Sequence, residues 1–315
     1  MLTTEKRRSK FKRAPKRKLY LTDNDLEILK LFGPEKLYGF NYLTAEIIAA
    51  ITGRYYNRLQ RRLRELYDHK YLNRYFPPYE KIGGSAKAVY MLSRGGADIL
   101  NEEYDEPVKV LDFDPEAYHP QLEHTTTTNW FRGLTMGACR RHSGVKLFYQ
   151  YPDHHFKIDF KVNLPQESFT AGLRPDWFFA IGRDGLPVRN FFVELQRPTR
   201  KTKNSSKASE VRSVKKKFRD YYYFYKLEGF NHISEEDYPD VMNLKNMRVL
   251  ILTDTGDQEH ENLIKLARDV DERGRGLRLF WFARVQDFDI ERPESLFREV
   301  WCTPVQGDKR WSILN

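Results

Sequence analysis

Two strand-like runs, each carrying one carboxylate, constrain this chain most strongly. Residues 173–179 contain Asp176 and residues 191–197 contain Glu194, each within an apolar, aromatic-rich sequence. On neighbouring strands such carboxylates can hold a hard divalent cation, because Mg²⁺ binds oxygen ligands and commonly uses one or two carboxylates plus substrate phosphates. The pair therefore predicts an α/β sheet whose edge carries a Mg²⁺ or Mn²⁺ site suited to phosphodiester chemistry.

The rest of this half of the chain alternates helical and strand-like patterns around the carboxylate pair. The order helix, four strands, helix, strand, helix, strand predicts an α/β domain over residues 120–315, with helices on the faces of its sheet. The expected helices cover residues 121–141, 206–227 and 257–272, and the expected strands, besides the carboxylate pair, cover residues 146–151, 156–162, 248–253 and 277–282.

The N-terminal part reads as three helices followed by a hairpin. Thr22 and Thr44 provide N-caps for the first two helices, and the third is expected over residues 54–68. Strand-like residues 71–76 and 88–92 flank a glycine-containing turn. This order predicts a winged helix-turn-helix over residues 20–101, whose third helix would enter the major groove of double-stranded DNA. Residues 102–119, rich in acid, Pro and Tyr, are expected to be a linker.

Basic and amide side chains cluster where such a protein would meet DNA. Guanidinium and amide groups can contact base edges and phosphates, and a basic loop beyond the Glu194 strand can receive the DNA backbone. A solvated helix face and a solvated surface loop are the competing interpretations. The expected DNA-binding residues are Arg54, Asn57, Arg58, Arg61 and Arg62 of the third helix, Lys81 and Lys87 of the hairpin, and Arg200, Lys201 and Lys203 of the loop.

Much of the net charge of +10 lies at the N-terminus. The first 18 residues contain nine Lys or Arg and a single acid, Glu5. We expect residues 1–19 to form a disordered arm attracted to polyanions, or else a purely solubilising arm. Cys139 and Cys302 are far apart, and no apolar run approaches the ~20 residues of a membrane helix. These features predict a cytoplasmic protein with no membrane partner.

The order of elements around Asp176 and Glu194 is similar to the core of the PD-(D/E)xK nucleases, the restriction-endonuclease-like superfamily. The resemblance implies that both carboxylates bind Mg²⁺ or Mn²⁺ and that Glu123, on the preceding helix, adds a ligand. Gln196 stands at the position of the catalytic lysine. Since Gln carries no charge, activation of water would fall to the metal or to a lysine of the next helix, among Lys215, Lys216 and Lys217. Of these, Lys217 is our candidate.

Several short motifs, in order over some 230 residues, resemble the replication-relaxation family. They lie at residues 21–29, 62–66, 90–97, 122–124, 174–176, 192–199 and 217–221. Members are encoded on plasmids and other mobile elements, and the family is related to the MobC-type relaxases that nick a transfer origin in conjugation. The resemblance implies action on double-stranded DNA, together with other DNA-processing proteins of the same element.

Two functions remain open. The chain is either a DNA-binding protein that nicks or processes DNA in a metal-dependent way during mobilisation or replication, or a non-catalytic accessory or replication-control protein with a degenerate nuclease fold. A ligand-sensing transcriptional regulator is a third, weaker interpretation. The tyrosines of the long helix, Tyr221, Tyr222, Tyr223 and Tyr225, offer a nucleophile in principle, although aromatic residues so spaced usually pack against a sheet.

Overall fold

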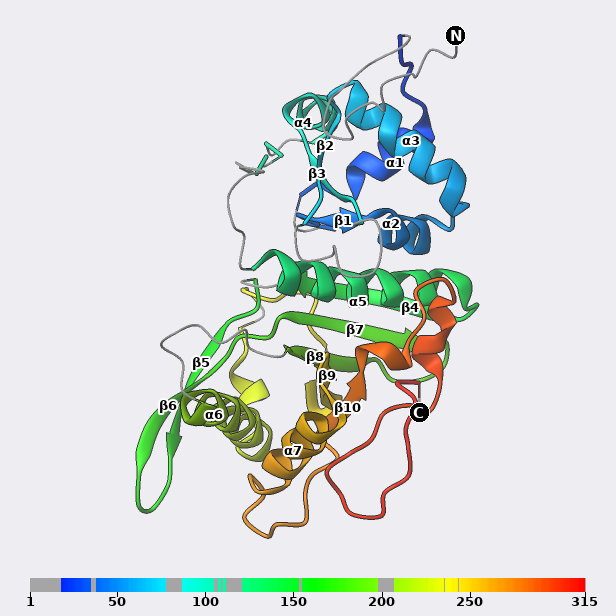
Figure 1. Ribbon diagram of the computed structural model, residues 1–315. Coiled ribbons are helices and arrows are strands. Elements are labelled where there is room, and N and C mark those ends of the chain that lie inside the picture. The colour runs from blue at the N-terminus through cyan, green and yellow to red at the C-terminus, as the bar shows by residue number, and fades with distance from the viewer. Residues whose placement is uncertain are drawn as a thin grey trace. The chain divides into compact units, whose positions relative to one another are not determined.

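The computed structural model places the chain in two compact units, Met1–Gly137 and Ala138–Asn315. It describes residues 18–34, 38–77, 87–104, 107–108, 110–111, 121–152, 155–197, 207–234, 236–242 and 244–314. The architecture is a mixture of helices and mixed sheets, so the broad α/β prediction is confirmed (Figure 1). The predicted basic arm and most of the predicted linker lie outside the described residues.

The first unit begins with short helices separated by capping residues. Thr22 precedes α1, whose third residue, Asp25, accepts a hydrogen bond from the Thr22 backbone N–H at 2.8 Å. Gly53 ends α2 with φ of 69°, a left-handed conformation that glycine adopts without steric cost. The elements are α1 (Asp23–Lys30), β1 (Leu43–Thr44), α2 (Ala45–Thr52), α3 (Tyr56–Asp68), β2 (Leu72–Tyr75), β3 (Val89–Leu92) and α4 (Arg94–Asn101).

An antiparallel three-stranded sheet with the order β1-β3-β2 completes this arrangement. The predicted helices and both hairpin strands are present within one or two residues of their expected ends. Helix α5 (Leu122–Arg141) crosses the division between the two compact units, which falls after Gly137. The predicted domain start near residue 120 lies at the beginning of this helix, as the sequence indicated, and the domain boundary itself stays a prediction.

The second unit is built on a five-stranded sheet with the order β10-β9-β8-β7-β4. Strands β4, β7 and β8 run antiparallel, whereas β8, β9 and β10 run parallel. The bounds are β4 (Val145–Pro152), β7 (Trp177–Arg183), β8 (Arg189–Gln196), β9 (Met247–Thr253), β10 (Phe280–Arg284), α6 (Lys207–Lys226) and α7 (Asp257–Arg268). Short 3₁₀ turns occupy Gly229–His232, Leu244–Asn246, Val285–Asp287 and Pro293–Phe297.

Helices α6 and α7 cover one face of this sheet (Figure 1). Their apolar side chains, including Phe218 and Ile264, pack against alternate strand residues such as Phe178, Phe192 and Val249. The long runs of buried β-strand residues in β7, β8 and β9 match a sheet buried on both faces.

One strand was not predicted. Residues 156–173 form a separate two-stranded hairpin, β5 (Ile158–Asn163) with β6 (Ser168–Leu173), where the sequence indicated a single strand. The hairpin packs on α6 rather than joining the main sheet, through Val162 and Ala171 against Tyr222 and Tyr223. Among the described residues, no helix is long and apolar enough to cross a membrane.

Candidate active site

Asp176 and Glu194 lie at the same edge of the main sheet. Asp176 directly precedes β7, and Glu194 is near the end of the antiparallel strand β8. The register of β7 with β8 ends at Trp177, the partner of Val193, and Asp176 and Glu194 each directly adjoin this last pair. The two carboxyl groups interact, since burial and the charge of Asp176 both raise the pKa of Glu194. The backbone fixes this position, because Asp176 N donates to Val193 O at 3.0 Å and Leu195 N donates to Asp176 Oδ2 at 2.7 Å.

The alternation of β8 turns Glu194 toward helix α6. Phe192, two residues earlier, stacks on Phe178 and packs against Tyr221 of α6, with ring centroids 4.5 and 5.7 Å apart. Glu194 occupies the next position on this face and is only 2% exposed. An aromatic core thus carries a carboxylate at its rim.

Two side chains of α6, one turn apart, meet the buried carboxylate. Lys217 Nζ lies 2.5 Å from Glu194 Oε2, and Tyr221 donates its hydroxyl to Glu194 Oε1 at 2.8 Å. Residues four apart on a helix share one face, which explains why both reach the same group. Lys217 is 42% exposed, so its ammonium contacts solvent on one side and the buried carboxylate on the other.

The protonation of Glu194 is balanced by opposing influences. Burial raises its pKa, Lys217 lowers it, and the charge of Asp176 raises it, with a net pKa of about 7. Burial and the neighbouring Glu194 charge raise the pKa of Tyr221 well above its ordinary value. Tyr221 is therefore a protonated hydrogen-bond donor at neutral pH, which argues against a nucleophilic role. The sequence analysis did not anticipate this donor role, although the i,i+4 spacing from Lys217 could have indicated it.

The donor set fits a magnesium or manganese ion held by two carboxylates. Each carboxylate oxygen has two lone pairs, so the hydrogen bonds to Glu194 and Asp176 leave further acceptor capacity. Mg²⁺ completes its coordination with waters and phosphate oxygens rather than with a full protein cage. Among the described residues, no group of three or more His, Cys, Asp or Glu side chains is arranged to hold a metal.

The other predicted members of this site are more scattered. Gln196 ends β8 and is half-buried, and its carbonyl accepts a hydrogen bond from Asp254 N at 2.9 Å. Lys216 pairs with the buried Asp220 at 2.5 Å rather than with Glu194. Glu123 lies in the first turn of α5 and in the first compact unit, so its role as a third ligand stays a prediction.

The arginines of α3 divide into two groups. Arg54 pairs with Glu27, and Arg62 pairs with the buried Asp25 and with Glu65, so both stabilise packing within the first unit. In contrast, Arg58 and Arg61 are exposed and have no ion-pair partner among the described residues. Asn57 is exposed beside them.

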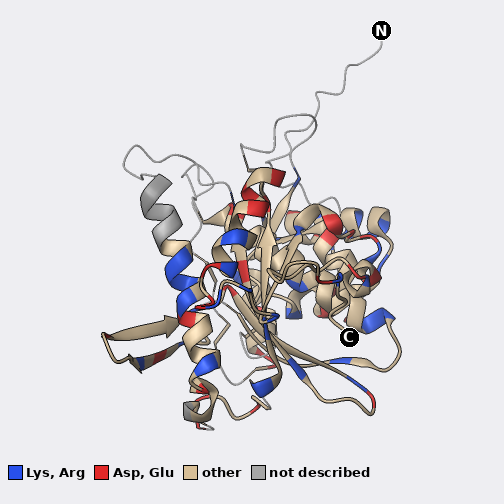
Figure 2. Ribbon diagram, turned by 90° about the horizontal axis from the view of Figure 1, so that it is seen from below, with Lys and Arg blue, Asp and Glu red and all other residues tan. Residues whose placement is uncertain are grey.

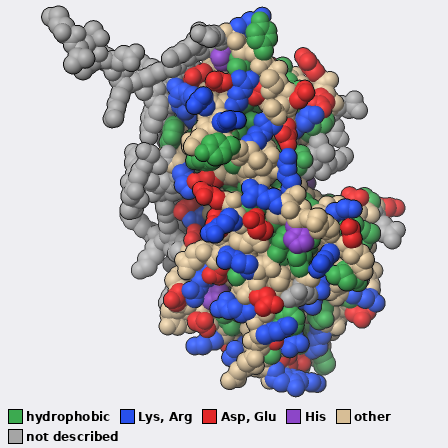
Figure 3. Space-filling model, turned by 90° about the vertical axis from the view of Figure 1, so that its right-hand side faces the viewer, with side chains coloured by type: hydrophobic (Ala, Val, Ile, Leu, Met, Phe, Trp, Pro, Cys, Tyr) green, Lys and Arg blue, Asp and Glu red, His purple; other side chains and the backbone are tan. Residues whose placement is uncertain are grey.

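The remaining predicted DNA contacts are only partly described. Lys87 is exposed and pairs with Glu46 at 2.9 Å. Lys81, Arg200, Lys201 and Lys203 lie outside the described residues. Figure 2 shows Lys and Arg on successive turns of α6. On the face drawn in Figure 3, basic and acidic side chains are interspersed, so charge alone does not delimit a DNA-binding surface there.

Comparison with known proteins identifies the family. The replication-relaxation family model matches residues 35–234, which is more than half of the chain. The chain therefore belongs to the replication-relaxation family. Neither a search of curated proteins nor a search of solved structures gave a match.

Proposed function

We propose that this replication-relaxation protein binds double-stranded DNA and nicks it in a Mg²⁺- or Mn²⁺-dependent reaction at Asp176 and Glu194. The observation that carries the proposal is the ion pair of Lys217 with Glu194 directly beside Asp176. A cation, a buried carboxylate with a pKa of about 7 and a second carboxylate meet at one sheet edge, which is a combination typical of catalytic sites. Family membership supports a role in replication or mobilisation of a mobile element.

In this reaction the two carboxylates would hold the metal ion, which lowers the pKa of bound water and polarises a phosphoryl oxygen. Lys217 would supply the positive charge that the uncharged Gln196, at the position of the catalytic lysine, cannot supply. Its ammonium extends from α6 to the carboxylate pair, where it can stabilise negative charge that develops on a phosphate. Tyr221 keeps Glu194 oriented by donating to Oε1. A PD-(D/E)xK-like site with its lysine moved to the following helix accounts for this arrangement.

DNA binding is assigned to the first unit. The order of α1, α2, α3 and the β2–β3 pair, with β1 joining the sheet, supports a winged helix-turn-helix. The exposed Asn57, Arg58 and Arg61 on α3 are the residues with which we expect this unit to contact the major groove. Arg54 and Arg62 are excluded from that set because their guanidinium groups are engaged inside the unit.

The test is a nicking assay on supercoiled plasmid with Mg²⁺ or Mn²⁺. The full chain should produce open circles, and Glu194→Gln or Asp176→Asn should reduce the rate by about 100-fold or more, as loss of a ligand group at a catalytic metal site does. Glu272→Gln is the matched control, because Glu272 also pairs with a lysine of α6, Lys226, but at an exposed site. Loss of nicking in the control as well would contradict the assignment.

A second candidate function is a non-catalytic accessory protein for replication control. The same ion pair favours it, because Lys217 and Tyr221 already satisfy both oxygens of Glu194 without a metal. In that case the full chain would bind duplex DNA yet produce no open circles with either cation. Its melting temperature would also be insensitive to Mg²⁺ and Mn²⁺.

A further inference from the structure

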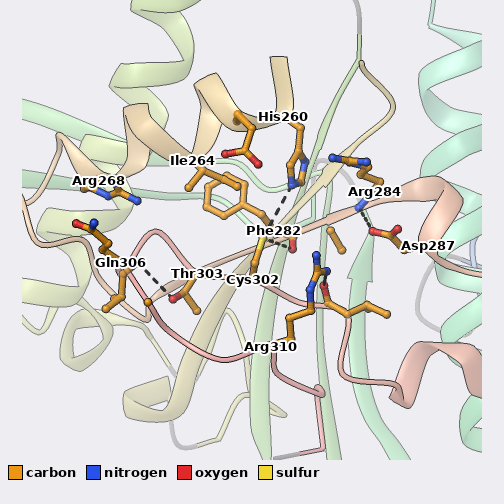
Figure 4. A pocket seen from close by; sticks show the side chains of 15 residues that line it. His260, Ile264, Arg268, Phe282, Arg284, Asp287, Cys302, Thr303, Gln306 and Arg310 are labelled. Carbon is orange, nitrogen blue, oxygen red and sulfur yellow. Dashed lines mark hydrogen bonds between the residues drawn. The ribbon is translucent and has the colours of Figure 1, made fainter. Parts of the chain in front are cut away.

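A cavity of about 320 Å³ lies in the second unit at the end of β10. It is bounded by α7, by the end of β10 and by the C-terminal segment around Cys302 and Arg310. Figure 4 shows Arg268 and Gln306 on one side, Arg284 and Arg310 on the other, and His260 and Cys302 between them. Nothing in the proposed nicking site uses these side chains.

Two of the three arginines that line the cavity donate to backbone carbonyl groups. Arg268 Nε donates to Pro304 O at 2.7 Å, and Arg310 Nη1 donates to Val300 O at 2.9 Å. Within the described part of the chain neither arginine has an ion-pair partner. Because a guanidinium has five N–H donors, each of these side chains has further N–H groups that can donate to a ligand. By contrast, Arg278 outside the cavity is held by both oxygens of Asp308 at 3.1 and 3.2 Å.

The remaining charged groups of the cavity are one paired arginine and two acids. Arg284 pairs with Asp257 at 2.8 Å, and Asp257 is exposed. The acids in the lining are Glu261 and Asp287, and the side chain of Asp287 accepts the backbone N–H of Arg284 at 2.8 Å. With Arg284 offset by Asp257, Arg268 and Arg310 are the lining arginines that keep no ion pair among the described residues, and Glu261 and Asp287 are the lining acids.

His260 adds a neutral polar wall. Burial and the neighbouring Arg284 lower its pKa, so the imidazole is uncharged at neutral pH. Its Nδ1 lies 2.7 Å from Thr253 Oγ1, and its Nε2 faces Cys302 Sγ at 3.9 Å. The ring is held in place by these contacts and contributes no positive charge of its own.

Strand register relates the cavity to the carboxylate pair. Gln196, two residues beyond Glu194, is the partner of Thr253, and Thr253 is the partner of Arg284. Strands in a sheet are spaced by about 4.8 Å, so Arg284 lies about 10 Å from Gln196 along the same edge. The carboxyl ends of the parallel strands β8, β9 and β10 thus share an edge with Asp176 and Glu194, where ligands of open α/β sheets commonly bind.

We propose that this cavity binds a phosphate group through Arg268, Arg284 and Arg310. Guanidinium groups suit this ligand because their paired N–H donors match phosphate oxygens. Resting on the proposed function, the inference adds that the bound phosphate belongs to the DNA strand that runs past Asp176 and Glu194. The phosphate of a free nucleotide has the same chemistry, and the experiment below separates the two sources.

The experiment measures binding to the full chain by calorimetry, without divalent cations so that the carboxylate pair takes no part. Inorganic phosphate, a nucleoside 5′-monophosphate, and short oligonucleotides with and without a 5′-phosphate are the probes. We expect saturable binding that Arg268→Gln with Arg310→Gln weakens at least tenfold. Arg292→Gln, an exposed arginine paired with Asp289 outside the cavity, should bind as the unchanged chain does.

A preference for the oligonucleotides that the double variant loses would support a DNA phosphate, because DNA binding by the first unit is the same in both proteins. A preference for the monophosphate that the double variant loses would overturn the DNA source and keep the phosphate site. No saturable binding, or equal binding by the double variant, would overturn the cavity assignment. If the double variant fails to fold, Arg310→Gln alone serves, since its side chain is exposed. If the unchanged chain binds phosphate at this cavity yet produces no open circles with Mg²⁺ or Mn²⁺, the proposed function alone is refuted and the cavity assignment stands.

Discussion

Two buried carboxylates, one in each unit, receive basic side chains in different ways. Asp25 of α1 is held at both oxygens by Arg62, with Nε–Oδ1 at 2.7 Å and Nη2–Oδ2 at 2.6 Å. It also accepts the backbone N–H and the hydroxyl of Thr22 at 2.8 and 2.7 Å. Glu194 of β8 has one lysine, one phenol and a second carboxylate beside it.

The two environments shift protonation in opposite directions. Burial alone raises the pKa of Asp25, but the hydrogen bonds from Arg62 and Thr22 outweigh it and leave the pKa below its ordinary value. For Glu194, burial and the charge of Asp176 outweigh Lys217, and the pKa rises to about 7. A carboxylate that accepts several hydrogen bonds, like Asp25, stays ionised at neutral pH and stabilises the folded structure. A carboxylate poised near neutrality can exchange a proton or accept a metal ion.

The largest expected effect is on stability, from replacing the cation of each pair. Arg62→Leu leaves the buried Asp25 without its main partner and should lower the free energy of unfolding by about 3–5 kcal/mol. Lys217→Leu should cost only ~1 kcal/mol, because Lys217 is partly exposed and Glu194 can become neutral by taking up a proton. Urea denaturation of both variants at pH 7 measures the difference. Equal losses of stability would show that the Lys217–Glu194 pair stabilises the fold as the Arg62–Asp25 pair does, which would contradict the distinction between the two pairs.

The exposed arginines of α3 should affect DNA binding, in contrast to Arg62, which should affect stability. Replacing Arg58 and Arg61 by Gln should weaken duplex binding about 10- to 100-fold and lower the slope of log K against log salt by about 1.8, since two phosphate contacts are lost. Their exposure predicts no loss of stability. Fluorescence anisotropy over a salt series gives both numbers. The charge-matched control, Arg183→Gln with Arg292→Gln, should leave the affinity and the salt slope unchanged. An equal loss of affinity in the control would show that the effect comes from net charge and not from contacts of α3.

The neighbourhood of Glu194 was predictable because local rules determine it. Alternation in the two strands fixes which residues face a helix, and the shared face of Lys217, Tyr221 and Phe224 follows from their i, i+4, i+7 spacing, although the sequence analysis used neither rule to bring these side chains together. Lys216 is rotated by about 100° from Lys217 and meets Asp220 instead. Helical phase therefore selects one lysine from three consecutive ones.

The structural roles of Arg54 and Arg62 were not predictable from the same pattern. Each pairs with an acid about 30 residues or more away in sequence, Glu27 or Asp25, and such contacts depend on how α1 packs against α3. The basic face looked uniform in sequence because periodicity reports which side of a helix is polar, not which groups meet a neighbouring element. The cavity beside β10 escaped prediction for a related reason, since its arginines come from segments distant in sequence.

Opposite pH dependences are expected for the two carboxylates. The raised pKa of Glu194 means that its protonated form favours the folded state, so its contribution to stability is present below pH ~4.5 and is lost as pH rises to about 7. The lowered pKa of Asp25 gives a contribution that is present above pH ~4 and is lost at lower pH. Differences in the free energy of unfolding between the unchanged chain and each variant should therefore have slopes of opposite sign, for Glu194→Gln between about pH 4.5 and 7 and for Asp25→Asn below about pH 4, so the measurements run from pH 2 to 8. Slopes of the same sign would contradict the assigned environments.

The smallest expected effect is the stabilisation by Mg²⁺, and it tests whether the balance at Glu194 serves metal binding. A metal ion requires the ionised carboxylate, so one proton must be released below pH 7 and the apparent affinity should fall about tenfold between pH 8 and pH 6. At tenfold excess over the dissociation constant, binding adds only about 1.4 kcal/mol to stability. Thermal melts with increasing MgCl₂ at both pH values measure this, with Asp25→Asn as the matched control that should keep the shift. Because Glu194→Gln removes both the ligand charge and the titrating proton, its melting temperature should not respond to Mg²⁺ at either pH. A pH-independent shift that survives in Glu194→Gln would locate the metal elsewhere and leave the Lys217 pair as a purely structural contact.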